Sequence, residues 1–354
     1  MKALTRKSNF ELLRIVAMCM IILIHLSSAI DLTSFGLKGN IGTILGGTIV
    51  GICNIGPSCF CLISGYFGIK FSKQKLIKME LLMISFSLLE TALLYWFFPQ
   101  EMTGAALLEQ LIKSIIPFAS RKYWFYSCYL CLFIFSRFIK KFIEKLKEQE
   151  LQIFIIVSLV IFSIFPTIFY FEIVQDSGKG IVQMVLLYII GRYIRLYKNF
   201  PIARWKCLLA LLFLWVINTI SIMYPIHLGG ITHSLCRDNS ITNLAMTIIL
   251  FYLFKDINIT SKIINYLTIN IFAVFALENS FTHICSGIIQ QYGWGVQQPV
   301  IALFLLIAIC IIIFIANVGI GAIRELFLSR LDQLIIQKII YIYNGFLRRF
   351  IKHL

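Results

Sequence analysis

The sequence predicts an all-α polytopic membrane protein with about ten transmembrane helices and both termini in the cytoplasm. Hydrophobic residues make up 59% of the 354 positions, and the mean hydropathy is +0.88. A soluble domain could not carry so apolar a surface. The apolar runs are continuous rather than alternating, and an open sheet cannot satisfy its backbone hydrogen bonds in lipid. Helices are therefore favoured over a barrel.

The predicted spans follow one another along the chain. Most of them reach the roughly 20 residues that a helix needs to cross a hydrocarbon core. The first run is too long for a signal peptide, contains Arg14 and lacks a small-residue cleavage site, so we expect it to remain as the first span. The ten predicted spans are residues 10–30, 41–69, 79–99, 123–139, 151–171, 180–197, 207–224, 241–254, 263–290 and 298–320.

The net charge of +16 is explained by topology. With the N-terminus inside, 25 Lys and Arg residues fall on the cytoplasmic side and 6 on the outer side. Cytoplasmic loops of membrane proteins carry such an excess. The basic charge therefore indicates orientation, and nucleic-acid binding is not predicted.

The chain divides into a membrane domain, residues 1–320, and a C-terminal tail, residues 321–354. The tail mixes apolar residues with Arg and Lys at helical spacing. This pattern predicts an amphipathic helix on the cytoplasmic leaflet, with its basic residues near anionic lipid headgroups.

An arginine and a histidine share one face of the first predicted helix. At about 100° per residue, the eleven positions from Arg14 to His25 return to within about 20° of the same direction, roughly 16 Å further along the axis. Charged groups in lipid are costly unless they face protein or water. The pair therefore predicts a polar track from the cytoplasmic side into the membrane.

Four segments carry most of the polar chemistry inside the predicted spans. They are Glu11-x-x-Arg14 followed by His25; the run Ile55 to Tyr66, which contains Pro57, Ser64 and Gly65; Tyr123-Trp124-Phe125-Tyr126; and the run Ile271 to Asn279, which contains Glu278. Glu90 is a further acidic residue inside a predicted span and is functional by default.

In this order the four segments resemble acyltransferase family three, the integral-membrane O-acyltransferases that decorate bacterial envelope glycans. The resemblance covers residues 10 to about 290. Glu278 stands where that family often has a second histidine, and Phe275 replaces a tyrosine.

The resemblance implies transfer of an acyl group, with acetyl as the expected one, in the bacterial cytoplasmic (inner) membrane. Acetyl-CoA is the expected donor substrate, and no bound cofactor is expected. The expected acceptor is a hydroxyl of a surface or capsular polysaccharide, or of its lipid-linked precursor. The partners are thus the donor, a glycan and the bilayer.

The chemistry of the residues fits these roles. Imidazole has an unperturbed pKa of roughly 6.5 and suits a general base, which we expect His25 to be. The guanidinium of Arg14 matches donor phosphates, and Glu11 one turn earlier is placed to orient it. The other predicted site residues are Glu278 and Asn279 as catalytic auxiliaries, Tyr123, Trp124 and Tyr126 on the acceptor side, and Pro57, Ser64 and Gly65 as a structural motif; no metal site is predicted.

Other interpretations stay open on the sequence alone. A histidine in a membrane helix can simply bond a neighbouring helix, and Ser64-Gly65 is typical of close helix packing. The aromatic residues at 123–126 fit an interfacial belt as well as a sugar-stacking surface. A glycan transporter or flippase, or a translocator of the acyl group, would also have many spans and buried charges.

Overall fold

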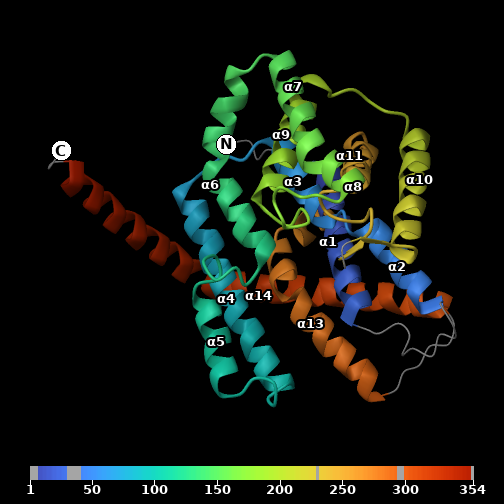
Figure 1. The fold of residues 1–354 in the computed structure, drawn as a ribbon. Helices are drawn as coiled ribbons and strands as arrows, with labels where there is room; N and C mark the ends of the chain where they lie inside the picture. The colour runs from blue at the N-terminus through green and yellow to red at the C-terminus, as the bar shows by residue number, and fades with distance from the viewer. Residues whose placement is uncertain (1–6, 30–40, 229–230, 293–298, 352–354) are drawn as a thin grey trace.

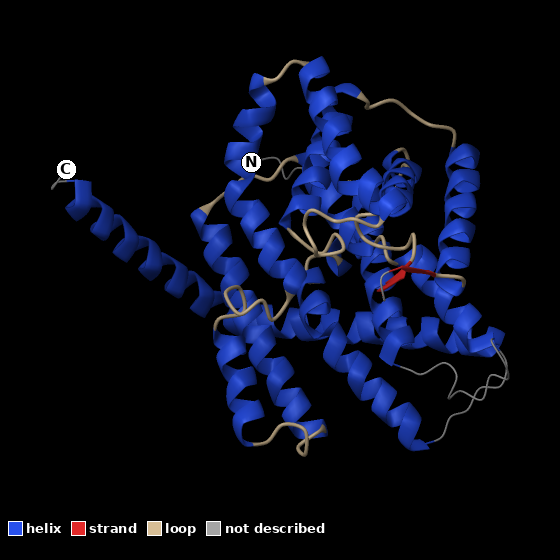
Figure 2. Ribbon diagram, in the orientation of Figure 1, coloured by secondary structure: helices blue, strands red, loops and turns tan. Residues whose placement is uncertain are grey.

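The computed structural model describes residues 7–29, 41–228, 231–292 and 299–351, and this part of the chain is almost entirely helical. Figures 1 and 2 show the helices and one short hairpin. The helices are α1 (Ser8–Ala29), α2 (Ile41–Cys53), α3 (Gly56–Phe67), α4 (Lys73–Phe97), α5 (Gly104–Ile115), α6 (Trp124–Lys145), α7 (Glu148–Leu159), the π-helical turn η1 (Val160–Ile164), α8 (Phe165–Phe169), α9 (Ile181–Tyr197), α10 (Arg204–Met223), α11 (Ile241–Lys255), α12 (Lys262–Leu267), α13 (Ile271–Tyr292) and α14 (Pro299–Ile351). The hairpin pairs β1 (Ile226–Leu228) with β2 (Ile231–His233) in antiparallel register.

Among the described residues, six helical segments are long and apolar enough to cross a membrane. They are Ser8–Ala29, Gly42–Phe67, Glu148–Phe169, Arg204–Met223, Ile271–Ile289 and Val300–Gly345. The all-α polytopic class is confirmed. The count of ten spans and the cytoplasmic position of both termini stay predictions.

Two of the predicted spans are interrupted. The run 41–69 forms α2 and α3, which meet at Asn54 and Ile55. Pro57 lies in the first turn of α3, where its missing N–H costs nothing, whereas in a continuous helix it would remove a hydrogen bond. The run 151–171 similarly contains a π-helical turn before the short helix α8, which includes Pro166.

Helix α5 is an element that the sequence analysis did not predict. It returns alongside α4 after a short turn, as Figure 1 shows. The Ser114 hydroxyl lies 2.8 Å from the Thr91 hydroxyl and donates to the carbonyl oxygen of Ser87 at 3.1 Å. These bonds hold the C-terminal end of α5 against α4, so the connection 116–123 enters the bundle rather than leaving it.

Helix α1 is positioned by contacts with α2, α3, α13 and α14. Leu13, Ala17, Met18 and Ile22 are completely buried along its length. Gly56 at the start of α3 lies so close that a Cβ there would come within 2.7 Å of the Ala17 carbonyl oxygen. This packing fixes the rotation of α1 and with it the directions of the polar side chains.

Helix α14 is continuous across the boundary predicted at residue 320. It runs for 53 residues, and its C-terminal part extends away from the other helices in Figure 1. Arg324 forms a buried ion pair with Asp332, and its guanidinium also donates to the Ser85 hydroxyl on α4. The residues that follow the last predicted span are therefore held to the bundle at their beginning. Contact of the tail with lipid stays a prediction.

Candidate functional site

Arg14 lies at an apolar cavity between helices. Its Nη1 donates to Glu11 Oε1 at 2.6 Å, which is the i,i+3 pair expected from the sequence. The cavity has a volume of about 170 Å³. Its lining comes from α1, α3, α6 and α13: Arg14, Met18, Ile21, Phe60, Ser64, Phe125, Tyr126, Tyr129, Ile271, Phe272 and Phe275.

His25 lies at a second cavity, which is larger and polar. Its volume is about 470 Å³. The lining residues are His25, Glu90, Leu94, Gln110, Lys113, Ser120, Arg121, Lys122, Tyr123, Trp124, Phe275, Glu278 and Asn279. Phe275 borders both cavities, and α1 contributes Arg14 to the lining of the apolar cavity and His25 to that of the polar cavity.

His25 and Glu278 form a hydrogen-bonded pair across α1 and α13. His25 Nδ1 lies 2.7 Å from Glu278 Oε1. The carboxylate accepts the Nδ1 proton, and this leaves the Nε2 lone pair of a neutral imidazole free to take a proton. The His25 side chain is 43% exposed and that of Glu278 only 4%. The imidazole can therefore meet a substrate, while the carboxylate holds it in place.

The second oxygen of Glu278 has no partner. Glu278 Oε2 is buried and makes no hydrogen bond in the described part of the chain. An unpaired buried carboxylate oxygen is costly, typically by one to a few kcal/mol. Because Glu278 lines the polar cavity, a donor group of a bound molecule can supply the missing hydrogen bond.

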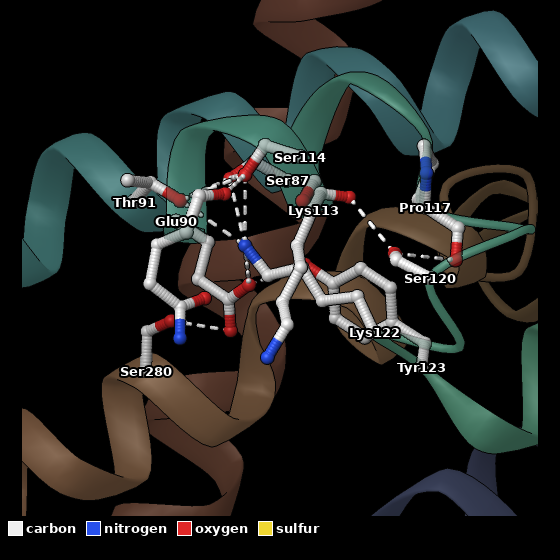
Figure 3. Close-up of polar contacts among 11 residues, drawn as sticks. Ser87, Glu90, Thr91, Lys113, Ser114, Pro117, Ser120, Lys122, Tyr123 and Ser280 are labelled. Carbon is white, nitrogen blue, oxygen red and sulfur yellow. Dashed lines mark hydrogen bonds and ion pairs between the residues drawn. The ribbon is translucent and has the colours of Figure 1, made fainter. Parts of the chain in front are cut away.

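A buried ion pair forms another wall of the polar cavity, drawn in Figure 3. Lys122 Nζ lies 3.0 Å from Glu90 Oε2, and both side chains are more than nine-tenths buried. Burial lowers the pKa of the Lys122 ammonium, and the charge of Glu90 and the hydrogen bond to it oppose that shift. The ammonium also donates to the hydroxyls of Thr91 and Ser114, at 3.1 and 2.9 Å.

Glu90 connects this ion pair to α13 and to the start of α6. Its Oε1 accepts from the Ser280 hydroxyl at 3.1 Å, and its Oε2 accepts from the Tyr123 hydroxyl. Ser280 is two residues from Glu278. The pair is therefore part of the support that holds Glu278 in reach of His25.

The structure brings most of the predicted site residues to the two cavities but divides the aromatic group. Tyr123, Trp124 and Asn279 line the polar cavity together with His25. Tyr126 instead lines the apolar cavity and donates to Glu80. Tyr126 thus lies on the Arg14 side rather than beside the other two aromatic residues.

The remaining predicted motif lies at the contact of α3 with α9. A Cβ at Gly65 would come within 2.2 Å of the Tyr188 carbonyl oxygen, so only glycine allows this approach. The Ser64 hydroxyl lies 3.1 Å from the Tyr129 hydroxyl and borders the apolar cavity. Pro57 begins α3, as described above.

Sequence reasoning missed Lys122, which it counted only among the six basic residues of the outer side. Its neighbours offered a signal, because Lys122 directly precedes the aromatic segment at 123–126 and an acidic residue, Glu90, lies in the preceding span. Within the described residues, no group of three or more His, Cys, Asp and Glu side chains is close enough to hold a metal ion.

Comparison with known families decides the assignment. A family model described as an acyltransferase domain matches residues 7–318. The chain belongs to acyltransferase family 3. No curated protein and no solved structure matches the chain. The matched range of this family 3 acyltransferase contains both cavities, the His25–Glu278 pair and the Glu90–Lys122 pair.

Proposed function

We propose that this membrane acyltransferase moves an acetyl group from acetyl-CoA to a hydroxyl of a bacterial surface or capsular polysaccharide, or of its lipid-linked precursor. The observation that carries the proposal is the pairing of His25 with Glu278 beside a polar cavity, while Arg14 occupies an apolar cavity across Phe275. A donor and an acceptor can thus approach one reaction centre from two sides.

The donor enters on the Arg14 side. The guanidinium of Arg14 is a permanent charge with several donors, which suits the phosphates of coenzyme A. Glu11 restrains it at 2.6 Å. The aromatic and aliphatic lining of the apolar cavity suits the uncharged arm that carries the thioester.

The transfer uses His25 as the general base. Its Nε2 takes the proton of the acceptor hydroxyl as the hydroxyl oxygen attacks the thioester carbonyl carbon. The carbon–sulfur bond then breaks, and the departing thiolate of coenzyme A takes the proton from His25 Nε2. Glu278 keeps the imidazole in the required tautomer and stabilises the imidazolium between these two transfers. Asn279 directly follows Glu278, is exposed and lines the same cavity. Its side-chain amide is the group that we assign as hydrogen-bond donor to the developing oxyanion.

The test is replacement of His25 by Ala, with His283→Ala as the matched control. His283 is on α13 and its side chain is 46% exposed. Its Nε2 lies 3.7 Å from Glu101 Oε2, and it lines neither of the two cavities. We expect His25→Ala to remove the O-acetyl signals from the NMR spectrum of the surface glycan while the protein stays in the membrane. His283→Ala should leave them. Acetylation retained by His25→Ala would refute the proposed role.

Transport of a glycan is the second candidate function, because the helix break between α2 and α3 resembles the discontinuous helices of transporters. The same glycan analysis separates the two functions. Deletion of an acyltransferase removes O-acetyl signals and leaves the amount of polymer unchanged, whereas deletion of a flippase removes the surface polymer itself.

A further inference from the structure

The polar cavity carries an excess of positive charge on one wall. Lys113, Arg121 and Lys122 line it from the end of α5 and the connection to α6, and the only lining carboxylates among the described residues are Glu90 and Glu278. His25 and Glu278 occupy the α1 and α13 side. The cavity thus has a proton-accepting end and a cationic end.

Lys122 does not contribute a free charge to this cationic end. Its ammonium is bound by Glu90 and by the Thr91 and Ser114 hydroxyls, and its side chain is only 9% exposed. In Figure 3 the Lys113 side chain runs past this cluster without joining it. The uncompensated charge therefore lies on the two neighbouring cations.

Lys113 and Arg121 are available to a ligand. Lys113 Nζ pairs with Glu109 at 2.5 Å, but the Glu109 side chain is 62% exposed, and a pair so open to water is weak and exchangeable. Arg121 is exposed, and within residues 7–29, 41–228, 231–292 and 299–351 no carboxylate lies within 4.0 Å of its guanidinium. Its backbone has φ of 51°, in the left-handed region that non-glycine residues seldom adopt. The chain accepts this strained conformation at the cavity wall.

The cations favour an anionic ligand, and Glu278 Oε2 sets a second requirement for that ligand. This buried oxygen has no hydrogen-bond partner among the residues that the structure describes, and Glu278 lines the same cavity, so a donor group of the bound molecule can pair with it. A hydroxyl group meets that need. A ligand that satisfies both ends of the cavity carries a hydroxyl at one end and a negative charge at the other.

We infer that the acceptor is an anionic glycan, whose phosphate or carboxylate group binds Arg121 and Lys113 while one of its hydroxyls reaches His25 Nε2 and another donates to Glu278. Arginine forms paired hydrogen bonds with either anion. A neutral sugar leaves the cationic end unused, and a basic sugar is repelled by it. The identity of the hydroxyl as an acyl acceptor rests on the proposed function, whereas the binding of the anion does not.

The experiment measures binding without any acyl donor. Purified protein in nanodiscs of zwitterionic lipid is titrated with glucuronate, glucose 6-phosphate and glucose, and the fluorescence of Trp124, which lines the cavity, reports binding. Trp124→Phe identifies the part of the signal that comes from this residue. We expect half-saturation by at least one of the anionic sugars at a concentration at least tenfold below that of glucose.

The variants test the site. Arg121→Gln should reduce the preference for the anionic sugar to less than threefold, and Arg121→Lys should keep part of it. The control is Arg137→Gln, because Arg137 is an exposed arginine in the C-terminal half of α6 that does not line the cavity, and it should keep the full preference. Binding of glucose 6-phosphate alone assigns a phosphorylated acceptor, and binding of glucuronate alone assigns a uronic acid; either result supports the inference.

Equal half-saturation by charged and uncharged sugars would overturn the inference, as would an unchanged preference in a folded Arg121→Gln protein. These outcomes are separate from those of the His25→Ala test. If anionic sugars bind but acetylation survives in His25→Ala, the proposed reaction fails and the anion site stands.

Discussion

Replacement of Glu278 by Gln tests the central contact of the site with little change in shape. The carboxylate accepts the Nδ1 proton of His25 at 2.7 Å and so leaves Nε2 as the base. An amide can present either its NH₂ group or its carbonyl oxygen to Nδ1. The two orientations set the limits of the expected effect.

If the NH₂ group faces His25, Nδ1 must accept a hydrogen bond, and the proton moves to Nε2. The imidazole then cannot act as a base, and a comparable change of tautomer in serine proteases costs about 10⁴-fold in kcat. If the carbonyl oxygen faces His25, the tautomer is kept but the charge is lost. A hydrogen bond to a charged group is worth about 1.5–3 kcal/mol, which corresponds to roughly 10- to 150-fold.

We therefore expect Glu278→Gln to lower kcat by about 10- to 10⁴-fold, with little change in the KM of the donor. The assay is the steady-state release of coenzyme A thiol by purified protein in the presence of acceptor. Glu278→Asp is the companion variant, because it keeps the charge but shortens the reach, and it should retain more activity than the amide. A Glu278→Gln enzyme with kcat within threefold of wild type would show that the contact does not orient the base.

Two further predictions concern the other charged groups of the site. Arg14→Gln should raise the KM for acetyl-CoA by about 10- to 100-fold, the value of one charge-assisted hydrogen bond, and Glu11→Gln should raise it by less. Donor titrations check this, and an unchanged KM in Arg14→Gln would remove Arg14 from the donor site. Glu90→Ala leaves the Lys122 ammonium buried without its counter-ion, which typically costs about 3–5 kcal/mol. In thermal denaturation, the unfolding midpoint of this variant should therefore be lower than that of the wild-type protein. The double variant Glu90→Ala with Lys122→Met should recover most of that stability, and a single variant as stable as wild type would show that the pair is not buried as described.

The directions of Glu11, Arg14 and His25 on α1 could be predicted from the sequence, because they depend only on the geometry of one helix. Arg14 and Glu11 form their i,i+3 pair, and Arg14 and His25 each face a cavity of the bundle. The acidic position at 278 was also visible as a departure from the family pattern. Its bond to His25 was not, because the two residues are 253 positions apart and their contact depends on how α1 packs against α13.

The parts of the fold that could not be predicted are those that depend on tertiary contacts. Lys122 looked like an ordinary outer-loop residue, since nothing nearby in the sequence shows that α5 folds back against α4 and carries the connection inward. The break before α3 has a local cause, Gly56 and Pro57, but residues 41–69 form one apolar run and were therefore predicted as a single span. The bond from Arg324, just after the predicted boundary at residue 320, to Ser85 on α4 also has no local signal, because it depends on how α14 packs against α4.

The position of Phe275 between the two cavities has a consequence for the cell as well as for the reaction. On the proposed topology, a thioester from the cytoplasm and a hydroxyl from outside meet within one protein, and that arrangement needs an opening toward each compartment. These two openings must not form a continuous path for ions through the membrane. Because Phe275 lines both cavities, we expect its ring to form an apolar boundary between them, across which the proposed acyl transfer takes place.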